Sequence, residues 1–155
     1  MPSDPDFDLN RAHRYFSVSC FNRAWDLLDR SKRTPQEDHE MVFLGMAALW
    51  HWKQREDCTP THLSIGYWQV ARIYTLLRQA DNAHLYAQQC LEISKMGDVA
   101  PFYLGYAYEA LARAEAVAGN RAAMQGYLEE ARHIVMHVTD PDDRDQLLED
   151  LDTVR

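Results

Sequence analysis

The chain has 155 residues, of which 46% are hydrophobic and 26% are charged, and this composition is typical of a soluble globular protein. A chain of this length can form one domain that buries roughly 70% of its unfolded surface. Its formal net charge of −8 repels nucleic-acid phosphates, so we expect no nucleic-acid partner.

Neither a targeting segment nor a membrane segment is expected. The first eight residues contain no basic stretch and no apolar stretch, unlike a secretion signal. The most apolar run, residues 41–52, is twelve residues long, whereas a bilayer needs about 20. Cys20, Cys58 and Cys90 are an odd number of cysteines without disulfide or zinc spacing. We therefore expect a cytoplasmic chain with reduced thiols and no membrane contact.

Apolar residues recur with helical periodicity along the whole chain, and no segment alternates as a half-buried strand does. Most breaks carry proline at the first helical position, preceded by a capping side chain or, at Ala100, by none. Gly97 and Gly119 stand where a left-handed residue commonly ends a helix. The expected capping residues are Thr34, Thr59 and Asp140. We expect seven helices, over residues 7–31, 35–55, 60–77, 82–96, 101–118, 121–138 and 141–154.

The apolar residues of these helices predict how they pack. The helix over 35–55 is apolar nearly all round in its middle, so we expect it to be the most enclosed. Because the connections are short, neighbouring helices should form three antiparallel hairpins, with the seventh helix capping the end. We expect one all-α domain over 1–155, with residues 1–6 as a flexible N-terminus. The stripe on the first helix comprises Leu9, Ala12, Phe16, Cys20, Ala24 and Leu27, and that on the last comprises Leu147, Leu148, Leu151 and Val154.

Residues 67–93 resemble a tetratricopeptide repeat in the order of their large, small and aromatic positions. A weaker second copy follows 41 residues later, instead of the family's usual 34. The resemblance implies an αα-superhelix, that is, a solenoid of helix hairpins. The first copy is carried by Tyr67, Val70, Ala71, Tyr74, Ala83, Tyr86, Cys90 and Leu91. The second is carried by Tyr108, Leu111, Ala112, Gly119, Asn120, Leu128 and Ala131.

Proteins of this family usually hold ligands in the concave groove formed by the first helix of each hairpin. The resemblance therefore implies a non-catalytic module that binds a peptide or partner protein, without a cofactor. The residues it indicates are Trp68, Gln69, Arg72, Tyr106, Glu109 and Arg113. The alternative is that Trp68 is ordinary packing and the arginines are a solvated face. A second-rank site comprises Asn22, Trp25 and His51. Asn22 and His51 have aromatic neighbours in the sequence, so we expect both to lie in apolar surroundings. A histidine there is more often an internally bonded core residue than a ligand contact.

Two other functions remain open at this point. Cys58 precedes a helix N-terminus with His62 one turn later, and both features lower a thiol pKa, so a redox-sensing or thiol-dependent enzyme is an alternative. A self-associating structural subunit, such as a homodimer, is another. His133 and His137 could face one metal ion, but two histidines fall short of the four ligands of structural zinc. We therefore interpret that pair as helix C-terminal residues and expect no metal.

Overall fold

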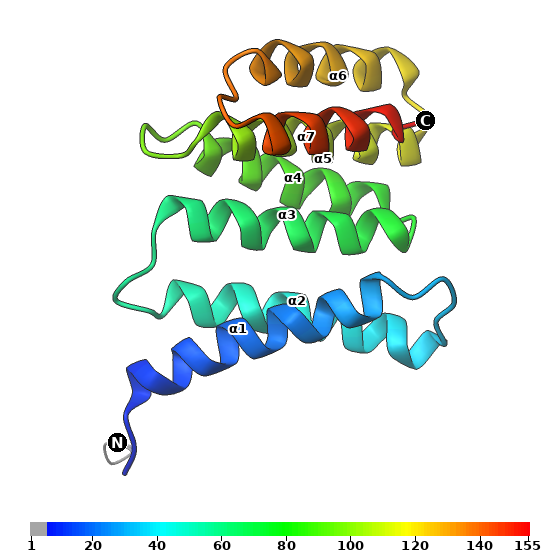
Figure 1. Ribbon diagram of the computed structural model, residues 1–155. Coiled ribbons are helices and arrows are strands. Elements are labelled where there is room, and N and C mark those ends of the chain that lie inside the picture. The colour runs from blue at the N-terminus through cyan, green and yellow to red at the C-terminus, as the bar shows by residue number, and fades with distance from the viewer. Residues whose placement is uncertain (1–5) are drawn as a thin grey trace. The chain divides into compact units, whose positions relative to one another are not determined.

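The structure is a computed structural model that describes residues 6–155. Within this range the chain forms seven α-helices and no strand, which confirms the predicted all-α class (Figure 1). The helices are α1 (Leu9–Leu28), α2 (Pro35–Lys53), α3 (Pro60–Leu76), α4 (Ala80–Ser94), α5 (Pro101–Ala118), α6 (Arg121–Val135) and α7 (Pro141–Asp152). The flexible N-terminus expected over 1–6 lies, apart from residue 6, outside the described residues.

The chain divides into two compact units, Met1–Thr59 and Pro60–Arg155. We call them the N-terminal unit and the C-terminal unit and describe each by itself. Whether they behave as one domain stays a prediction. In the N-terminal unit α1 packs against α2, and in the C-terminal unit each helix packs against the next.

Several helix ends have the predicted chemistry. Thr34 caps α2 with a capping box, in which its hydroxyl accepts from the Glu37 amide and the Glu37 carboxylate accepts from the Thr34 amide. Asp140 caps α7 through the amides of Asp142 and Asp143. α5 begins after Ala100 without a side-chain cap, as expected.

The left-handed residues are only partly those predicted. Gly119 ends α5 with φ of 79°, as expected. Gly97 does not end α4, because the helix finishes in a right-handed conformation at Lys95. The second left-handed residue within 6–155 is Arg78, with φ of 56°, just after α3. The Arg78 amide donates to the Thr75 carbonyl and the next amide donates back to Tyr74, which is a Schellman ending normally made with glycine.

The N-terminal unit is less enclosed than its sequence predicts. Leu9 and Phe16 of the α1 stripe are 49% and 44% exposed, and Phe43 and Trp50 of α2 are 68% and 53% exposed. The expectation that α2 is the most enclosed helix is therefore wrong. A helix apolar on all sides needs neighbours on all sides to be buried. The buried side of the hairpin comprises Ala24, Leu27, Leu28, Met41, Leu44, Ala48, Leu49 and Trp52.

The most enclosed helix is α5, which contacts α3, α4, α6 and α7. Eight of its 18 residues are buried, against six of 19 in α2. Its glycine and alanines allow neighbouring backbones to approach closely. α7 lies in front of α5 in Figure 1, and α3, α5 and α7 all end at the same edge of the C-terminal unit. The buried residues of α5 are Gly105, Tyr106, Ala107, Glu109, Ala110, Leu111, Ala112 and Ala114.

The 41-residue offset seen in the sequence is also present in the packing. The first hairpin of the C-terminal unit stacks Tyr67 on Tyr86, with ring centroids 6.5 Å apart. The second pairs Tyr108 with Tyr127, also at 6.5 Å. The hairpins α3–α4 and α5–α6 therefore share this tyrosine pairing at positions 41 residues apart, and we compare other residues at the same offset.

Candidate functional site

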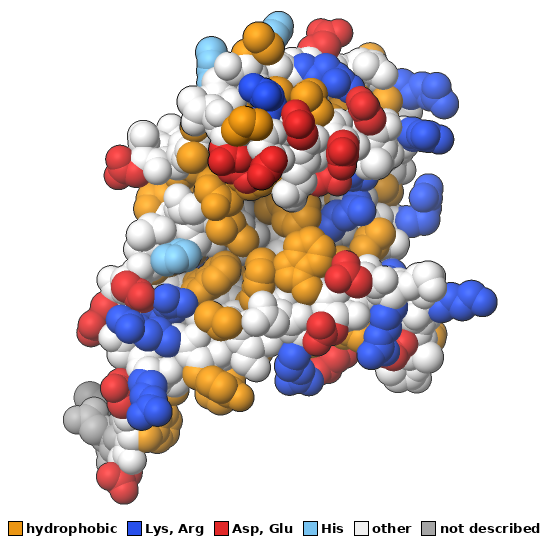
Figure 2. All heavy atoms as spheres, viewed as in Figure 1, with side chains coloured by type: hydrophobic (Ala, Val, Ile, Leu, Met, Phe, Trp, Pro, Cys, Tyr) orange, Lys and Arg blue, Asp and Glu red, His pale blue; other side chains and the backbone are white. Residues whose placement is uncertain are grey.

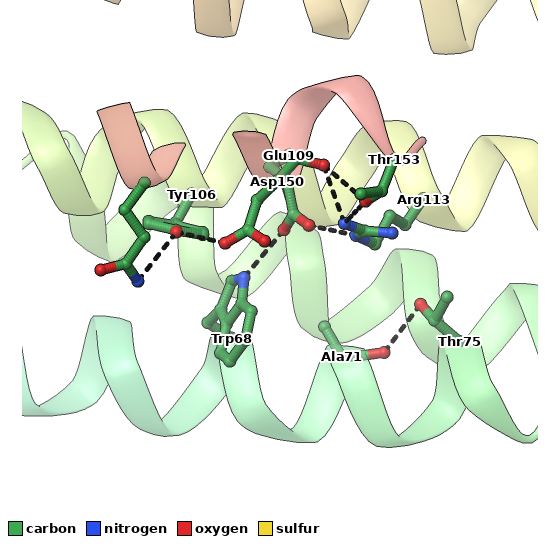
Figure 3. Close-up of polar contacts among 9 residues, drawn as sticks. Trp68, Ala71, Thr75, Tyr106, Glu109, Arg113, Asp150 and Thr153 are labelled. Atoms are coloured by element: carbon green, nitrogen blue, oxygen red, sulfur yellow. Dashed lines mark hydrogen bonds and ion pairs between the residues drawn. The ribbon is translucent and has the colours of Figure 1, made fainter. Parts of the chain in front are cut away.

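Glu109 of α5 is the centre of a polar network on the face formed by α3, α5 and α7 (Figure 3). Its side chain is only 1% exposed. The indole nitrogen of Trp68 donates to one carboxylate oxygen at 2.9 Å, and Arg113 donates to the other. A buried carboxylate is tolerated when such donors compensate for lost hydration. Trp68 and Arg113 are therefore held in place by Glu109.

The same network ties α5 to α7. The Arg113 guanidinium donates to the Asp150 carbonyl at 3.1 Å and to the Thr153 hydroxyl at 2.6 Å. The Tyr106 hydroxyl donates to the Asp150 carboxylate at 2.5 Å and accepts from the Gln146 amide at 3.3 Å (Figure 3). Burial, and then the bond to Asp150, raise the pKa of Tyr106. Tyr106 is therefore an uncharged donor that anchors α7.

Arg72 of α3 occupies the position equivalent to Arg113 but has a different environment. Glu109 lies four positions before Arg113, whereas Trp68 lies four positions before Arg72. Arg72 therefore has no carboxylate one turn earlier on its own helix. The guanidinium group of the partly buried Arg72 forms no hydrogen bond or ion pair with any residue of the range 6–155. Burial, followed by repulsion from Arg113, lowers the pKa of Arg72, and attraction to the Glu109 and Asp150 carboxylates opposes this only in part.

A pocket of about 190 Å³ lies where the three helices end. Its charged lining residues are all arginines, and Figure 2 shows Lys and Arg side chains gathered along this edge. Acidic side chains are gathered nearby on α7. The lining residues are Thr75, Arg78, Arg113, Ala116, Val117, Thr153, Val154 and Arg155.

The structure separates the predicted groove residues by exposure. Gln69 and Glu109 are 0% and 1% exposed and Tyr106 is 8% exposed. Trp68, Arg72 and Arg113 are partly buried and keep some accessible surface. The buried members can position their neighbours, and the partly buried ones can also touch a ligand. Trp68 packs partly against the core cluster of α5, α6 and α7, so the packing interpretation holds for part of its surface.

Sequence reasoning missed the contribution of α7 and of the helix ends. Asp150, Thr153 and Arg155 lie in a segment interpreted only as a cap, and Thr75 and Arg78 lie at the end of α3. Arg78 was the one detectable signal, because the position 41 residues later is Gly119. An arginine aligned with a helix-ending glycine is unexpected.

The second-rank residues of the N-terminal unit do not all come together. His51 faces His13 of α1, with their Nδ1 atoms 2.8 Å apart, which confirms an internally bonded histidine. Burial, and then the charge of His13, lower the pKa of His51. The Trp25 ring instead lies near the Phe21 ring, with ring centroids 6.3 Å apart. Asn22 is exposed, so the expectation that it lies in apolar surroundings is wrong.

The surroundings of Cys58 differ from those that the alternative thiol chemistry requires. Burial raises the pKa of Cys58, and Asp57 adds to this, while Arg55 and Lys53 oppose it. The expected lowering of that thiol pKa is wrong. Within residues 6–155, no group of three or more His, Cys, Asp or Glu side chains could hold a metal ion. No helix in the described part of the chain is long and apolar enough to cross a bilayer.

Comparison with known proteins adds no assignment. No protein-family model matches the chain, and neither a curated protein nor a solved structure matches it.

Proposed function

We propose that this chain is a non-catalytic, cytoplasmic binding module of the tetratricopeptide-like kind. It holds a peptide or a segment of a partner protein on the face of the C-terminal unit formed by α3, α5 and α7. The resemblance of residues 67–93 to the repeat supports this, as does the recurrence of one hairpin arrangement after 41 residues.

The observation that carries the proposal is Arg72. A guanidinium that loses hydration without gaining a partner is costly, and its usual compensation is an anionic group. Arg72 is partly buried, its pKa is lowered by burial, and no residue within 6–155 pairs with it. Arginine side chains bind carboxylates with two parallel hydrogen bonds. The Arg72 guanidinium can thus donate hydrogen bonds to a carboxylate of a bound chain.

Trp68 supplies the apolar part of the same face. Its ring packs edge-on against Tyr106, with centroids 5.6 Å apart, and its indole nitrogen is anchored on Glu109. A fixed aromatic ring binds an apolar side chain with little loss of conformational entropy. Tyr106, Glu109 and Gln69 then act by positioning, because they are buried.

The test is a selection of random peptides on the full chain, with counter-selection on Arg72→Gln. Selected peptides should bind the wild type and lose at least about tenfold in affinity to Arg72→Gln, as expected for one charge-assisted pair of about 1.5–3 kcal/mol. The matched control is Arg121→Gln, which removes an exposed arginine at the start of α6. Enrichment that is equal on wild type and Arg72→Gln would reject the proposal. Arg72→Gln is preferred to changes at Trp68, which also supports Glu109.

A second candidate is a self-associating subunit, and the N-terminal unit favours it. Phe43 and Trp50 of α2, with Tyr15 and Phe16 of α1, are exposed by 44–68%. Clustered exposed aromatic side chains mark interaction surfaces more often than scattered ones do. Sedimentation over a range of concentrations tests this: association that disappears in Phe43→Ser/Trp50→Ser favours the candidate, and a concentration-independent monomer excludes it.

A further inference from the structure

We propose that the pocket at the ends of α3, α5 and α7 binds a single oxyanion, a carboxylate or phosphate group carried by the peptide ligand. The inference rests on the proposed function, since it names the chemical group that the binding face takes at this edge. The pocket is formed within the C-terminal unit by the ends of α3 and α5 and by the residues that follow α3 and α7.

The charge of the pocket carries the inference. Three arginines and no acidic side chain line it. Arg113 is compensated by Glu109, but the guanidinium groups of Arg78 and Arg155 form no hydrogen bond or ion pair with any described residue. In a chain whose net charge is −8, two uncompensated guanidinium groups at one pocket are a local exception. The partial negative charge of helix C-termini offsets them only in part.

The backbone of Arg78 provides an independent observation. Its φ of 56° is costly for a residue with a Cβ. The equivalent position in the next hairpin is Gly119, which adopts the same ending without that cost. Residues held in such a conformation tend to occur at functional sites. The strained backbone delivers the Arg78 side chain to the pocket, where a glycine would contribute no charge.

The size and the hydrogen bonds of the pocket define its ligand. A volume of about 190 Å³ is below the ~300–1,000 Å³ of small-molecule sites, so one charged group fits better than a cofactor. The hydroxyls of Thr75 and Thr153 already donate to the carbonyls of Ala71 and Asp150. The donors left for a ligand are therefore guanidinium groups, which match an oxyanion geometrically. The acidic side chains on α7 (Figure 2) disfavour a long acidic segment.

The experiment titrates the full chain with three small probes and follows arginine Nε and backbone amide signals by NMR. The probes are N-acetyl-alanyl-alanine with a free carboxylate, its C-terminal amide, and inorganic phosphate. We expect saturable shifts at the pocket with at least one anion, with dissociation constants of about 1–10 mM, and none with the amide. The anion with the lower dissociation constant is the oxyanion that the pocket prefers, and a preference for either anion supports the proposal.

Variants separate the pocket from non-specific charge. Arg78→Asn removes the charge while asparagine tolerates a left-handed backbone, so the fold should be retained, as a melting curve will show. Arg78→Asn and Arg155→Gln should each weaken anion binding at least threefold, and together they should abolish it. Arg121→Gln should leave binding unchanged.

The proposal is overturned if neither anion binds, if the amide binds as well as the acid, or if the double variant binds like wild type. Peptides that depend on Arg72 while no anion enters the pocket would remove this inference and leave the proposed function standing. Conversely, anion binding without any selectable peptide would remove the proposed function and leave the pocket as an anion site.

Discussion

The hairpins α3–α4 and α5–α6 share one apolar arrangement but differ in their buried polar groups. Both place a tyrosine pair at 6.5 Å. In the first hairpin the Ser64 and Ser94 hydroxyls lie 2.6 Å apart and Cys90 donates to the Ser64 carbonyl at 3.3 Å. The positions equivalent to these three residues in the second hairpin are Gly105, Val135 and Ala131. The two hairpins thus share their tyrosine pairing and differ in the polar residues at equivalent positions.

The outward faces differ in the same way. α5 carries Glu109 where α3 carries Trp68, so Arg113 is paired and Arg72 is not. The difference makes α5 the anchor for α7 and leaves the Arg72 guanidinium of α3 without an ion-pair partner among the described residues. Each prediction below changes one position at which the two hairpins differ.

The largest effect is expected from Glu109→Ala. Removing this carboxylate leaves the partly buried Arg113 without its ion-pair partner and the Trp68 indole without this acceptor, and such a loss typically costs about 3–5 kcal/mol of unfolding free energy. Urea denaturation measures it. Trp68→Phe, which removes only one hydrogen bond to that carboxylate, should cost about 1–3 kcal/mol. Equal costs for the two variants would contradict a central role for Glu109.

Gly105→Ser introduces the residue of the first hairpin into the second. A Cβ at position 105 would lie 2.4 Å from Cδ2 of Leu147, which is fully buried, so either the Leu147 side chain or α7 must shift. We expect a loss of about 1–3 kcal/mol, measured by thermal or urea unfolding. The control is Gly126→Ser on α6, where a Cβ meets nothing within 4 Å. A Gly105→Ser protein as stable as the control would show that α7 is not seated on Gly105.

Cys90→Ala makes the opposite exchange and should change the pH dependence of stability. Burial raises the pKa of Cys90 from 9.0 to about 12, although bonds with Ser94 and Ser64 lower it. Above pH 9 the unfolded chain loses this proton and the folded chain keeps it, so stability should fall between pH 9 and pH 12. The wild type should lose on the order of 1 kcal/mol more than Cys90→Ala between pH 8 and pH 10.

Because the pKa values of Cys20, Cys58, Tyr74 and Tyr106 are also raised, only the difference between the two proteins is informative. Identical alkaline melting curves for wild type and Cys90→Ala would contradict the burial of this thiol.

The smallest effect is expected from Arg78→Gly, which gives α3 the ending of α5. Glycine removes the cost of holding a residue with a Cβ in the left-handed conformation, but it also increases the conformational entropy of the unfolded chain. The net effect should stabilise the protein by about 0.5–1 kcal/mol. Lys95→Gly is the control, because the backbone there is right-handed and glycine should destabilise. A destabilised Arg78→Gly protein would mean that the arginine side chain contributes to folding.

How far the sequence could predict the fold depends on whether a feature is local. The bounds of α5 were predicted to the residue, because Pro101 starts the helix and Gly119 ends it. The predicted capping box at Thr34 is present for the same local reason. The left-handed residue after α3 was missed, because arginine carries no such preference. The exposure of Phe43 and Trp50 was missed, because burial depends on which neighbours a helix has.

The candidate site follows the same division. The resemblance to a tetratricopeptide repeat indicated Trp68, Arg72, Glu109 and Arg113, because it implies which positions of a helix face the groove. Only the tertiary structure decided that Glu109 is buried between Trp68 and Arg113 and that Arg72 has no such partner within the described residues. It also decided that the ends of α3, α5 and α7 enclose a pocket. A contact between residues about 40 positions apart depends on how helices pack, and short-range sequence patterns contain no record of that packing.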